Sequence, residues 1–472
     1  MRSGLGLPRT RGRVAVALGV VLAASLMSSC SSGHRPTSAP PTTSTSAPPP
    51  TSTSAPPPAS GGGTQTTSCG TRPSGPAVQV TSFGATGNGV TDDSAAFQRA
   101  VEVAASEHGY VSVPAPSVAY RISHSVRLES GVAITGGAAR PTIVGGVQKS
   151  YVFRLLDVTG ASVSCLGFDL GHLDHASGVH VTGSSDITLA DLSIQNVTQG
   201  WGINIGGNGK STANSNTGVT VSDSTFAGFD SSLEEVIAFN SSSVTVSGCH
   251  FGSAVFHPAG GGLGLYQNDN GVNVLGNTFG PGIGNSGVYY SITVNNVTFE
   301  NNTFVGDGTA SMGNAGIKGA NVSDHGVFGQ SSVANYVFSG NTFEDLRIAL
   351  QLGALDGARV SGNHFTSNHM AIEVDGGNSF KVHLHTPDSA MTINANQFAE
   401  NVSSIYFKGT GALQGVSITG NDFGSSASPI TFYGPYTWTG LSITGNSYGG
   451  PSGEFISRVH GAQLGPSTSV GN

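Results

Sequence analysis

One short motif recurs along this 472-residue chain and limits what the chain can fold into. The motif consists of an apolar stretch, a small residue, an asparagine, one free position and an aromatic. Five copies read VTFENNTF, YVFSGNTF, ARVSGNHF, VSITGNDF and LSITGNSY. The residue that closes each unit recurs every 22–39 residues, most often after about 25. A period of this size is typical of solenoids, whose stacked coils share one continuous core.

The motif places two residue types in register along the solenoid. The closing positions are Phe168, Ile194, Phe226, Phe251, Phe279, Phe304, Phe343, Phe365, Phe398, Phe423 and Tyr448. The asparagines stand two residues earlier, at Asn277, Asn302, Asn341, Asn363, Asn396, Asn421 and Asn446. We expect the stacked Asn side chains to hydrogen-bond from coil to coil and to adopt the left-handed backbone of a tight turn.

Composition agrees with a chain of short strands. The sequence has 70 glycines and only 10% charged residues, which disfavours long helices and favours turns between strands. One amphipathic helix is predicted early, with Asp92 or Asp93 as its N-cap and with Ala96, Phe97 and Ala100 on its apolar face.

The segment that contains this helix reads VTSFGATGNGVTDDSAAFQRAVEVAASEHGYVSVP. It resembles the start of pectate-lyase-like β-helices, in particular the rhamnogalacturonase/epimerase-like N-terminal signature. In that family a Gly-rich turn leads into a helix that caps the open end of the coil. The resemblance implies an all-β fold, a right-handed parallel β-helix of about ten coils with a short N-terminal capping helix, over residues 76–460.

The first residues predict export from the cell. Four arginines precede an apolar run over 14–26, which is too short to span a bilayer and is typical of a secretory signal over 1–29. The LMSSC that ends at Cys30 resembles a bacterial lipoprotein signal, which implies lipidation of Cys30. Residues 30–75 are rich in Pro, Ser and Thr and predict a disordered tether, and 461–472 a tail. We therefore expect a secreted cell-surface lipoprotein that meets the membrane only through its lipid.

Charge and cysteine content limit the possible partners and cross-links of the chain. The formal net charge is −8, and removal of the signal segment takes away arginines but no acids, which argues against nucleic acid as a partner. With Cys30 lipidated, three cysteines remain, so the sequence predicts no disulfide framework. We expect a monomer.

A second set of strands, among them GVHVT, GVYYS, ALQLG and AIEVD, alternates with period two and exposes one sheet face. We expect Ile237 and Phe239 to face inward and Ala238 outward on one of these coils. The outward positions combine aromatic, charged and small residues, which suits an elongated sugar chain. The residues expected to bind it are His180, Tyr289, Arg347, His369, Tyr406 and Lys408.

The candidate catalytic residues are Glu373, Asp375 and Lys318. Glu373 and Asp375 lie two residues apart on one strand face, so their backbones are about 6.6 Å apart, near the separation of an inverting glycosidase's two acids. Lys318 on a neighbouring coil would tune their pKa values. The other interpretation is a surface ion-pair network. On either interpretation both side chains point outward, so we expect Glu373→Gln to leave folding almost unchanged.

Residues 230–269 offer a second candidate site. They resemble the coil of pectate lyases in which a carboxylate helps to hold calcium, which implies Glu234 or Glu235 as a ligand of Ca²⁺. The family's catalytic arginine is expected one coil later, where this chain reads NSGVYYSI, without Arg or Lys. Neither the aspartates typical of β-helical polygalacturonases nor the motif of alginate epimerases is visible.

Two functions therefore remain open. One is an extracellular enzyme, a glycoside hydrolase or a polysaccharide lyase, with an elongated glycan cleft on one sheet face. The other is a non-catalytic β-helix that binds glycan or acts as a surface adhesin. The charges on the face favour the enzyme, and the departures from each enzyme motif favour the binder.

Overall fold

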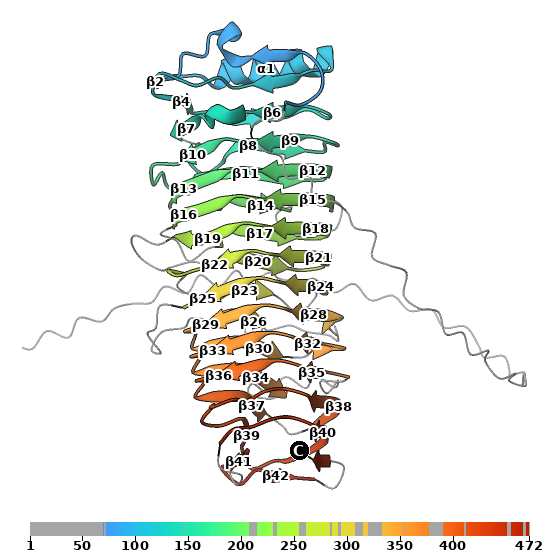
Figure 1. Ribbon diagram of the computed structural model, residues 1–472. Coiled ribbons are helices and arrows are strands. Elements are labelled where there is room, and N and C mark those ends of the chain that lie inside the picture. The colour runs from blue at the N-terminus through green and yellow to red at the C-terminus, as the bar shows by residue number, and fades with distance from the viewer. Residues whose placement is uncertain are drawn as a thin grey trace, which may run out of the picture. The chain divides into compact units, whose positions relative to one another are not determined.

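The structure is a computed structural model that describes Cys69 and most of the chain from residue 72 to 471 (Figure 1). The gaps within that part are 146, 207–214, 230–233, 254–260, 284–285, 291–293, 307–314, 320–332, 354, 377–389, 410–411, 451–454 and 466–468. The predicted signal segment, Cys30 and nearly all of the predicted tether lie outside the described residues. In the described part, no helix has the length and apolar character needed to cross a membrane.

Three parallel sheets wind along the chain, and their coils stack in sequence order, as the colours of Figure 1 show. Sheet A comprises β1 Ala77–Gln79, β3 Tyr110–Ser112, β6 Ala133–Thr135, β9 Ser162–Ser164, β12 Ser185–Ala190, β15 Asn216–Ser222, β18 Ser241–Ser247, β21 Asn270–Leu275, β24 Asn295–Glu300, β28 Tyr336–Ser339, β32 Arg359–Ser361, β35 Thr392–Asn394, β38 Ala412–Thr419, β40 Thr437–Thr444, β42 Gln463–Leu464 and β43 Ser469–Gly471.

Sheet B comprises β2 Asn88–Asp92, β4 Ala119–Ile122, β7 Thr142–Gly145, β10 Gly167–Asp169, β13 Ser193–Val197, β16 Thr225–Phe229, β19 His250–Ser253, β22 Thr278–Phe279, β25 Thr303–Val305, β29 Thr342–Glu344, β33 His364–Thr366 and β36 Gln397–Ala399. Sheet C comprises β5 Val126–Arg127, β8 Tyr151–Leu156, β11 Ser177–Thr182, β14 Ile203–Ile205, β17 Val236–Phe239, β20 Leu263–Tyr266, β23 Ser286–Tyr290, β26 Ala315–Gly319, β30 Ile348–Gly353, β34 Met370–Gly376, β37 Ser403–Gly409, β39 Ile430–Tyr433 and β41 Ile456–Val459. A small separate sheet pairs β27 Val333–Ala334 with β31 Leu355–Asp356.

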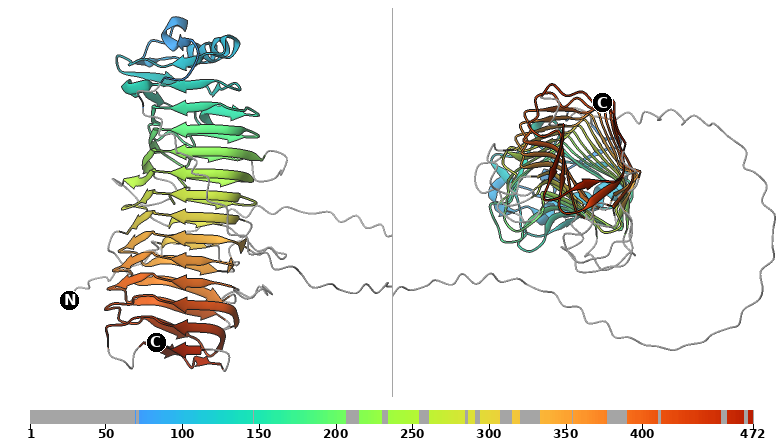
Figure 2. Two further views of the ribbon diagram at one scale, coloured as in Figure 1. Left: turned by 45° about the vertical axis from the view of Figure 1, so that its right-hand side comes forward. Right: turned by 90° about the horizontal axis from the view of Figure 1, so that it is seen from below.

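This architecture confirms the predicted parallel β-helix. The end-on view of Figure 2 shows the sheets surrounding one interior. The closing aromatics fill that interior as a stack, with ring centroids 4.6 Å apart between Phe251 and Phe279 and 4.9 Å apart between Phe398 and Phe423. Residues 461–472, set apart as a tail, contain β42 and β43, and both pair with β40.

The predicted capping helix is α1, Ser94–Glu107, and its face of Ala96, Phe97 and Ala100 is buried. Asp93 occupies the N-cap position, but its carboxylate makes no cap bond. It accepts instead from the backbone N–H groups of Thr86, at 2.7 Å, and Gly87, at 3.3 Å. The aspartate therefore fixes the Gly-rich turn to the start of the helix.

The asparagines form the predicted ladder at the corner between sheets A and B. Both the backbone N–H and the side-chain amide of Asn341 donate to Oδ1 of Asn363, each at 2.9 Å. The prediction that these asparagines have left-handed backbone is wrong. That conformation belongs to the residue before each one, such as Gly340 at φ 64° and Ala395 at φ 54°, because the asparagine's part is the side-chain bond.

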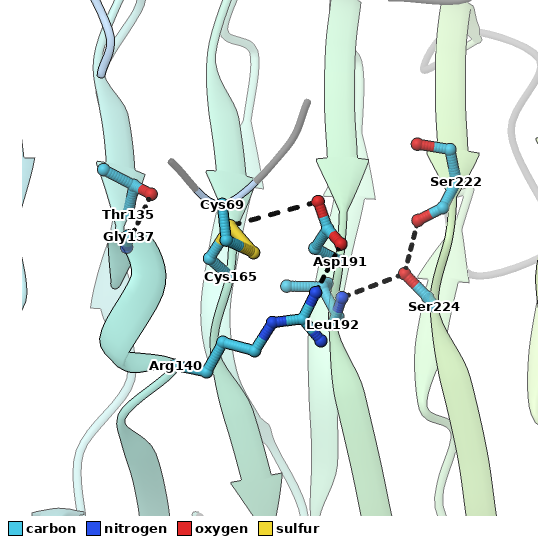
Figure 3. The surroundings of a disulfide bond; sticks show 9 residues. All are labelled: Cys69, Thr135, Gly137, Arg140, Cys165, Asp191, Leu192, Ser222 and Ser224. Atoms are coloured by element: carbon cyan, nitrogen blue, oxygen red, sulfur yellow. Dashed lines mark hydrogen bonds and ion pairs between the residues drawn. A yellow bond between two sulfur atoms is a disulfide. The ribbon is translucent and has the colours of Figure 1, made fainter. Parts of the chain in front are cut away.

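A disulfide joins Cys69 to Cys165, across 96 residues of sequence, and corrects the expectation that the cysteines serve no cross-link. Cys165 lies between β9 and β10, at the same A–B corner. Figure 3 shows that the Asp191 carboxylate of the next coil lies beside the disulfide and is bound by Arg140, with an Nη2–Oδ1 distance of 2.7 Å. The bond ties the segment before the first strand to the body of the β-helix.

Candidate functional site

The outward side chains of sheet C form the face on which the sequence placed its site. The predicted alternation is confirmed at Glu373 and Ile372: Ile372 is fully buried in the core, and Glu373 aligns with Gln351 and Tyr406 on the other side. On β17 the prediction is wrong. Val236 and Ala238 pair with the inward Leu263 and Leu265, so Ile237 and Phe239 face outward. All four residues of this strand are apolar, so the sequence held no alternation that could fix the phase.

An acid and three aromatics occupy the centre of this face. The Tyr266 hydroxyl donates a hydrogen bond to Oε1 of Glu234. The Tyr266 ring lies between two neighbours, with centroids 4.9 Å from Phe239 and 5.4 Å from Tyr289. We call Phe239, Tyr266 and Tyr289 the aromatic stack. Because these rings pack on one another from coil to coil, β17, β20 and β23 together present a continuous strip of aromatic edges to the outside of sheet C.

Gly264 makes room for this arrangement. A Cβ atom at Gly264 would lie 2.6 Å from the Tyr266 ring and 2.9 Å from Cγ of Glu234, closer than carbon atoms pack. The glycine therefore lets the acid and the phenol meet across the strand. The period-two alternation of the strands predicts that the Tyr266 side chain faces outward, but nothing in the sequence indicates that Glu234 reaches its hydroxyl.

Burial sets the protonation of this pair. Loss of solvent raises the pKa of Glu234, and the bond from Tyr266 opposes that rise only in part. Burial, followed by the charge of Glu234, raises the pKa of Tyr266. A carboxyl that holds its proton longer than a solvated glutamate is suited to general-acid chemistry.

Glu235 does not share this site with Glu234. Its side chain is buried, and this burial raises the pKa of Glu235 well above the usual range. The hydrogen bond from the Gly252 backbone opposes that rise only in part. Glu234 reaches toward β20 of sheet C, and Glu235 toward the end of β19 in sheet B. Among the described residues, the one group of three potential metal ligands is Cys69, Cys165 and Asp191, and two of these are joined in the disulfide. In the part of the chain that the structure describes, Glu234 and Glu235 therefore do not converge on one another.

The predicted catalytic cluster lies farther along the same face. Oε1 of Glu373 accepts from Nε2 of Gln351 at 2.6 Å and lies 2.8 Å from Nζ of Lys408. Glu373 is only 3% exposed, so its carboxylate is held by Gln351 and Lys408 and has little contact with solvent. The backbone of Lys318 pairs with Gln351, and that of Asp375 with Lys408, but both side chains lie outside the described residues.

The remaining predicted binding residues divide between the face and its margin. The Tyr406 ring lies 5.8 Å from that of Tyr433, and burial, then Tyr433 and Glu373, raise the pKa of Tyr406. Arg347 and His369 are exposed on adjacent coils, in the turns that precede β30 and β34. They lie at the edge of the face.

His180 belongs to a separate group near the N-terminal end. Its ring stacks on Tyr151 with centroids 4.4 Å apart, and Asn204 donates to the Tyr151 hydroxyl at 2.8 Å. Burial, with a smaller contribution from Arg154, lowers the pKa of His180. We call Tyr151, Arg154, His180 and Asn204 the N-terminal polar cluster. Sequence reasoning found His180 but missed Tyr151 and Arg154, since no periodic signal marks them.

Known proteins can now be set beside this geometry. Residues 77–257 match the family described as rhamnogalacturonase A/epimerase, pectate lyase-like. No curated protein matches the chain. The surface adhesin PfbA of Streptococcus pneumoniae has a similar fold, with 16% identity over 84% of this chain and 93% of that one and a TM-score of 0.52.

Two phage proteins are similar to the same degree. A tailspike protein of E. coli bacteriophage HK620, solved in complex with a pentasaccharide, is 15% identical over 82% of this chain and 72% of that one, with a TM-score of 0.53. Bacteriophage phi29 gene product 12 is 16% identical over 82% and 56%, with a TM-score of 0.53. The chain is therefore a parallel β-helix, and its residues 77–257 match the pectate lyase-like family.

Proposed function

We propose that the outward face of sheet C binds an extended extracellular polysaccharide and that Glu234 is the acid that cleaves it. The observation that carries the proposal is the Glu234–Tyr266 hydrogen bond within the aromatic stack. The C–H groups of sugar rings pack against aromatic surface such as this strip, and a carboxyl with a raised pKa beside it can protonate the oxygen of a glycosidic bond. The family match over 77–257 and a tailspike of similar fold that was solved with a pentasaccharide are consistent with such a ligand.

The reaction is a glycosidic cleavage, by hydrolysis or by elimination. In both, the leaving oxygen takes a proton, which is the part assigned to Glu234. Tyr266, whose raised pKa keeps its phenol neutral, holds the carboxyl in place through its donated bond. The two reactions differ in their products, since only elimination leaves an unsaturated sugar that absorbs in the ultraviolet.

Purified protein would be incubated with a panel of neutral and acidic polysaccharides, and both reducing ends and ultraviolet absorbance would be followed. We expect Glu234→Gln to lower turnover about 100-fold or more, the usual loss for a missing acid. The matched control is Glu344→Gln, an exposed position in sheet B, and it should leave turnover unchanged. Full activity of Glu234→Gln would overturn the assignment.

The alternative, a glycan-binding or adhesin-like β-helix without catalysis, is favoured by a different observation. Within sheet C, Glu373 is the one carboxylate whose side chain the structure describes, and Lys408 and Gln351 hold it. Hydrolysis requires a second carboxyl group besides Glu234. Binding of a polysaccharide by calorimetry, with neither product signal, would identify this second function.

We further propose that the protein works outside the cell, anchored through a lipid on Cys30, as a monomer that binds no nucleic acid. The Cys69–Cys165 disulfide supports the location, because such bonds persist in oxidising compartments. Detergent partitioning of the wild type and of Cys30→Ala tests the anchor: the variant should leave the detergent phase or fail to mature. Calcium binding at Glu234 or Glu235 stays a prediction, and chelator-sensitive activity would support it.

A further inference from the structure

The N-terminal polar cluster holds several buried polar atoms without a hydrogen-bond partner. On the outward side of sheet C, Arg154 of β8 pairs in register with His180 of β11, and His180 pairs with Asn204 of β14. His180 and Asn204 are each only 7% exposed. The atoms of the cluster without a partner are Nε of Arg154, Nδ1 of His180 and Oδ1 of Asn204, and Oγ1 of Thr182, two residues along β11 from His180, has none either.

The existing bonds determine what each free atom can do. Nε2 of His180 lies 2.9 Å from the carbonyl oxygen of Gly206, and a carbonyl only accepts, so Nε2 carries the proton. Burial lowers the pKa of His180 and keeps the ring neutral, which leaves Nδ1 as a bare acceptor. The amide of Asn204 donates to Tyr151, so its free Oδ1 is a second acceptor. Nε of Arg154 can only donate.

A partner for this set must both donate and accept. A carboxylate offers acceptors alone and would leave His180 Nδ1 and Asn204 Oδ1 unsatisfied. A hydroxyl group can donate to one of these acceptors and accept from Arg154. Buried polar atoms in folded proteins are nearly always paired, so three free atoms within one cluster call for a ligand or a water.

We propose that the N-terminal polar cluster is a second subsite of the sheet C face, one that recognises adjacent hydroxyl groups of a sugar ring. In this subsite, His180 Nδ1 and Asn204 Oδ1 accept from the sugar, and Arg154 Nε donates to it. The assignment rests on the proposed function, since the same glycan would cross both sites. Three coils separate β11 from β20, or about 14 Å along the axis, so one oligosaccharide can reach from His180 to Tyr266.

The first test is nitrogen NMR of the histidine rings in the whole protein. The His180 signals are assigned by their loss in His180→Gln, and the probes are cellohexaose, hexagalacturonate and acetate. We expect Nδ1 of His180 to resonate as a bare acceptor and to shift with at least one of the two hexasaccharides but not with acetate. If neither sugar moves it, the cluster holds an internal water only. If acetate moves it, the subsite recognises carboxylates. Either result overturns the proposal.

Affinity measurements separate this proposal from the proposed function. We expect His180→Gln and Asn204→Ala each to weaken hexasaccharide binding about tenfold, the loss for about 1.4 kcal/mol. The matched control is His364→Gln, an exposed position in sheet B, which should bind as the wild type. If Tyr266→Ala abolishes binding while both cluster variants bind normally, the subsite is wrong and the central site stands. If only the cluster variants lose binding, the subsite stands and the central site is wrong.

Discussion

Two lines of polar side chains run along this β-helix, and they differ in how completely they are paired. At the A–B corner, each ladder asparagine receives bonds from one coil and gives bonds to the next; Asn341, for example, accepts from Asn302 and donates to Asn363. On the outward face of sheet C, His180, Asn204 and Arg154 each keep an atom without a partner. The hydrogen-bonding groups of the ladder are satisfied within the protein, whereas some of those on the sheet C face are not.

The two lines also differ in whether the same residue recurs from coil to coil. The ladder uses the same residue on seven successive coils, because every coil poses the same hydrogen-bonding problem. The sheet C face changes its residue at each coil, from His180 and Asn204 to Gly264 and Tyr289. The repeated asparagine serves the stacking of coils, and the unrepeated residues of the sheet C face are the ones that we propose bind a ligand. Substitutions in the two lines should therefore affect different measurements.

Asn341→Ala should have the largest effect, and it should act on folding. The change removes the partner of the Asn302 backbone N–H and of the Phe299 carbonyl, while the Asn302 side-chain amide keeps its bond to the carbonyl of Val274. At about 1–3 kcal/mol for each of the two buried groups that lose a partner, the free energy of unfolding should fall by about 2–6 kcal/mol.

Urea unfolding followed by circular dichroism measures this loss. The control is Asn273→Ala, in the middle of β21 on the outer side of sheet A, which should cost less than about 1 kcal/mol. A ladder variant as stable as this control would show that the ladder contributes little, and the contrast between the two lines would disappear.

Cys69→Ser should come next, through the disulfide at the same corner. The bond closes a loop of 96 residues, and cross-links of this kind contribute about 2–4 kcal/mol. We expect a lower melting temperature and unchanged glycan binding, because the disulfide lies away from sheet C. Reducing the wild type should lower its melting temperature to that of the variant, and the same reductant should not change the variant. A variant that melts with the oxidised wild type would contradict a stabilising role.

The repeats made the fold predictable, but the residues of the site do not repeat, so the repeats could not predict the site. The asparagine and aromatic columns revealed the solenoid because a core residue such as Phe279 has the same environment as Phe304 one coil later. The phase of β17 was missed because its four apolar residues carry no alternation. The Glu234–Tyr266 bond was missed because it depends on the space left by Gly264, which no repeat signals.

The disulfide and the state of Glu373 were out of reach for related reasons. Cys69 lies before the first repeat, so no coil spacing relates it to Cys165. Glu373 was expected to point outward, either as a catalytic acid or within a surface ion-pair network, but its neighbours cover it almost completely, because an outward position in a strand is not always an exposed one. The alternation of residues predicts which side of the sheet a side chain occupies, but only the folded structure shows how much of that side chain is exposed to solvent.

Glu373→Gln follows in size, and because the side chain is buried we now expect a larger effect on folding than the sequence alone suggested. The substitution removes the carboxylate that pairs with Lys408 and accepts from Gln351. Lys408 keeps part of its surface in solvent, so we expect a loss of about 1–3 kcal/mol in unfolding free energy, below the cost of a fully buried pair. The double variant Glu373→Gln/Lys408→Met should recover part of this loss. If the single variant is as stable as the wild type, Glu373 is a free acid and belongs among the catalytic candidates again.

Glu235→Gln should give the smallest effect at acid pH, and this effect should grow as the pH rises. Burial raises the pKa of Glu235 in the folded protein, so the folded state keeps a proton that the unfolded chain releases above its ordinary value of about 4.5. This contribution to stability is complete at acid pH and is lost as the pH rises, by about 1.4 kcal/mol per pH unit until the folded pKa is reached. Melting temperatures between about pH 4 and pH 8 should therefore fall less steeply for Glu235→Gln than for the wild type. The exposed Glu344→Gln should follow the wild-type curve. Parallel curves for Glu235→Gln and the wild type would mean that this carboxyl finds a partner when the protein folds, and it would then join the ladder among the completely paired groups.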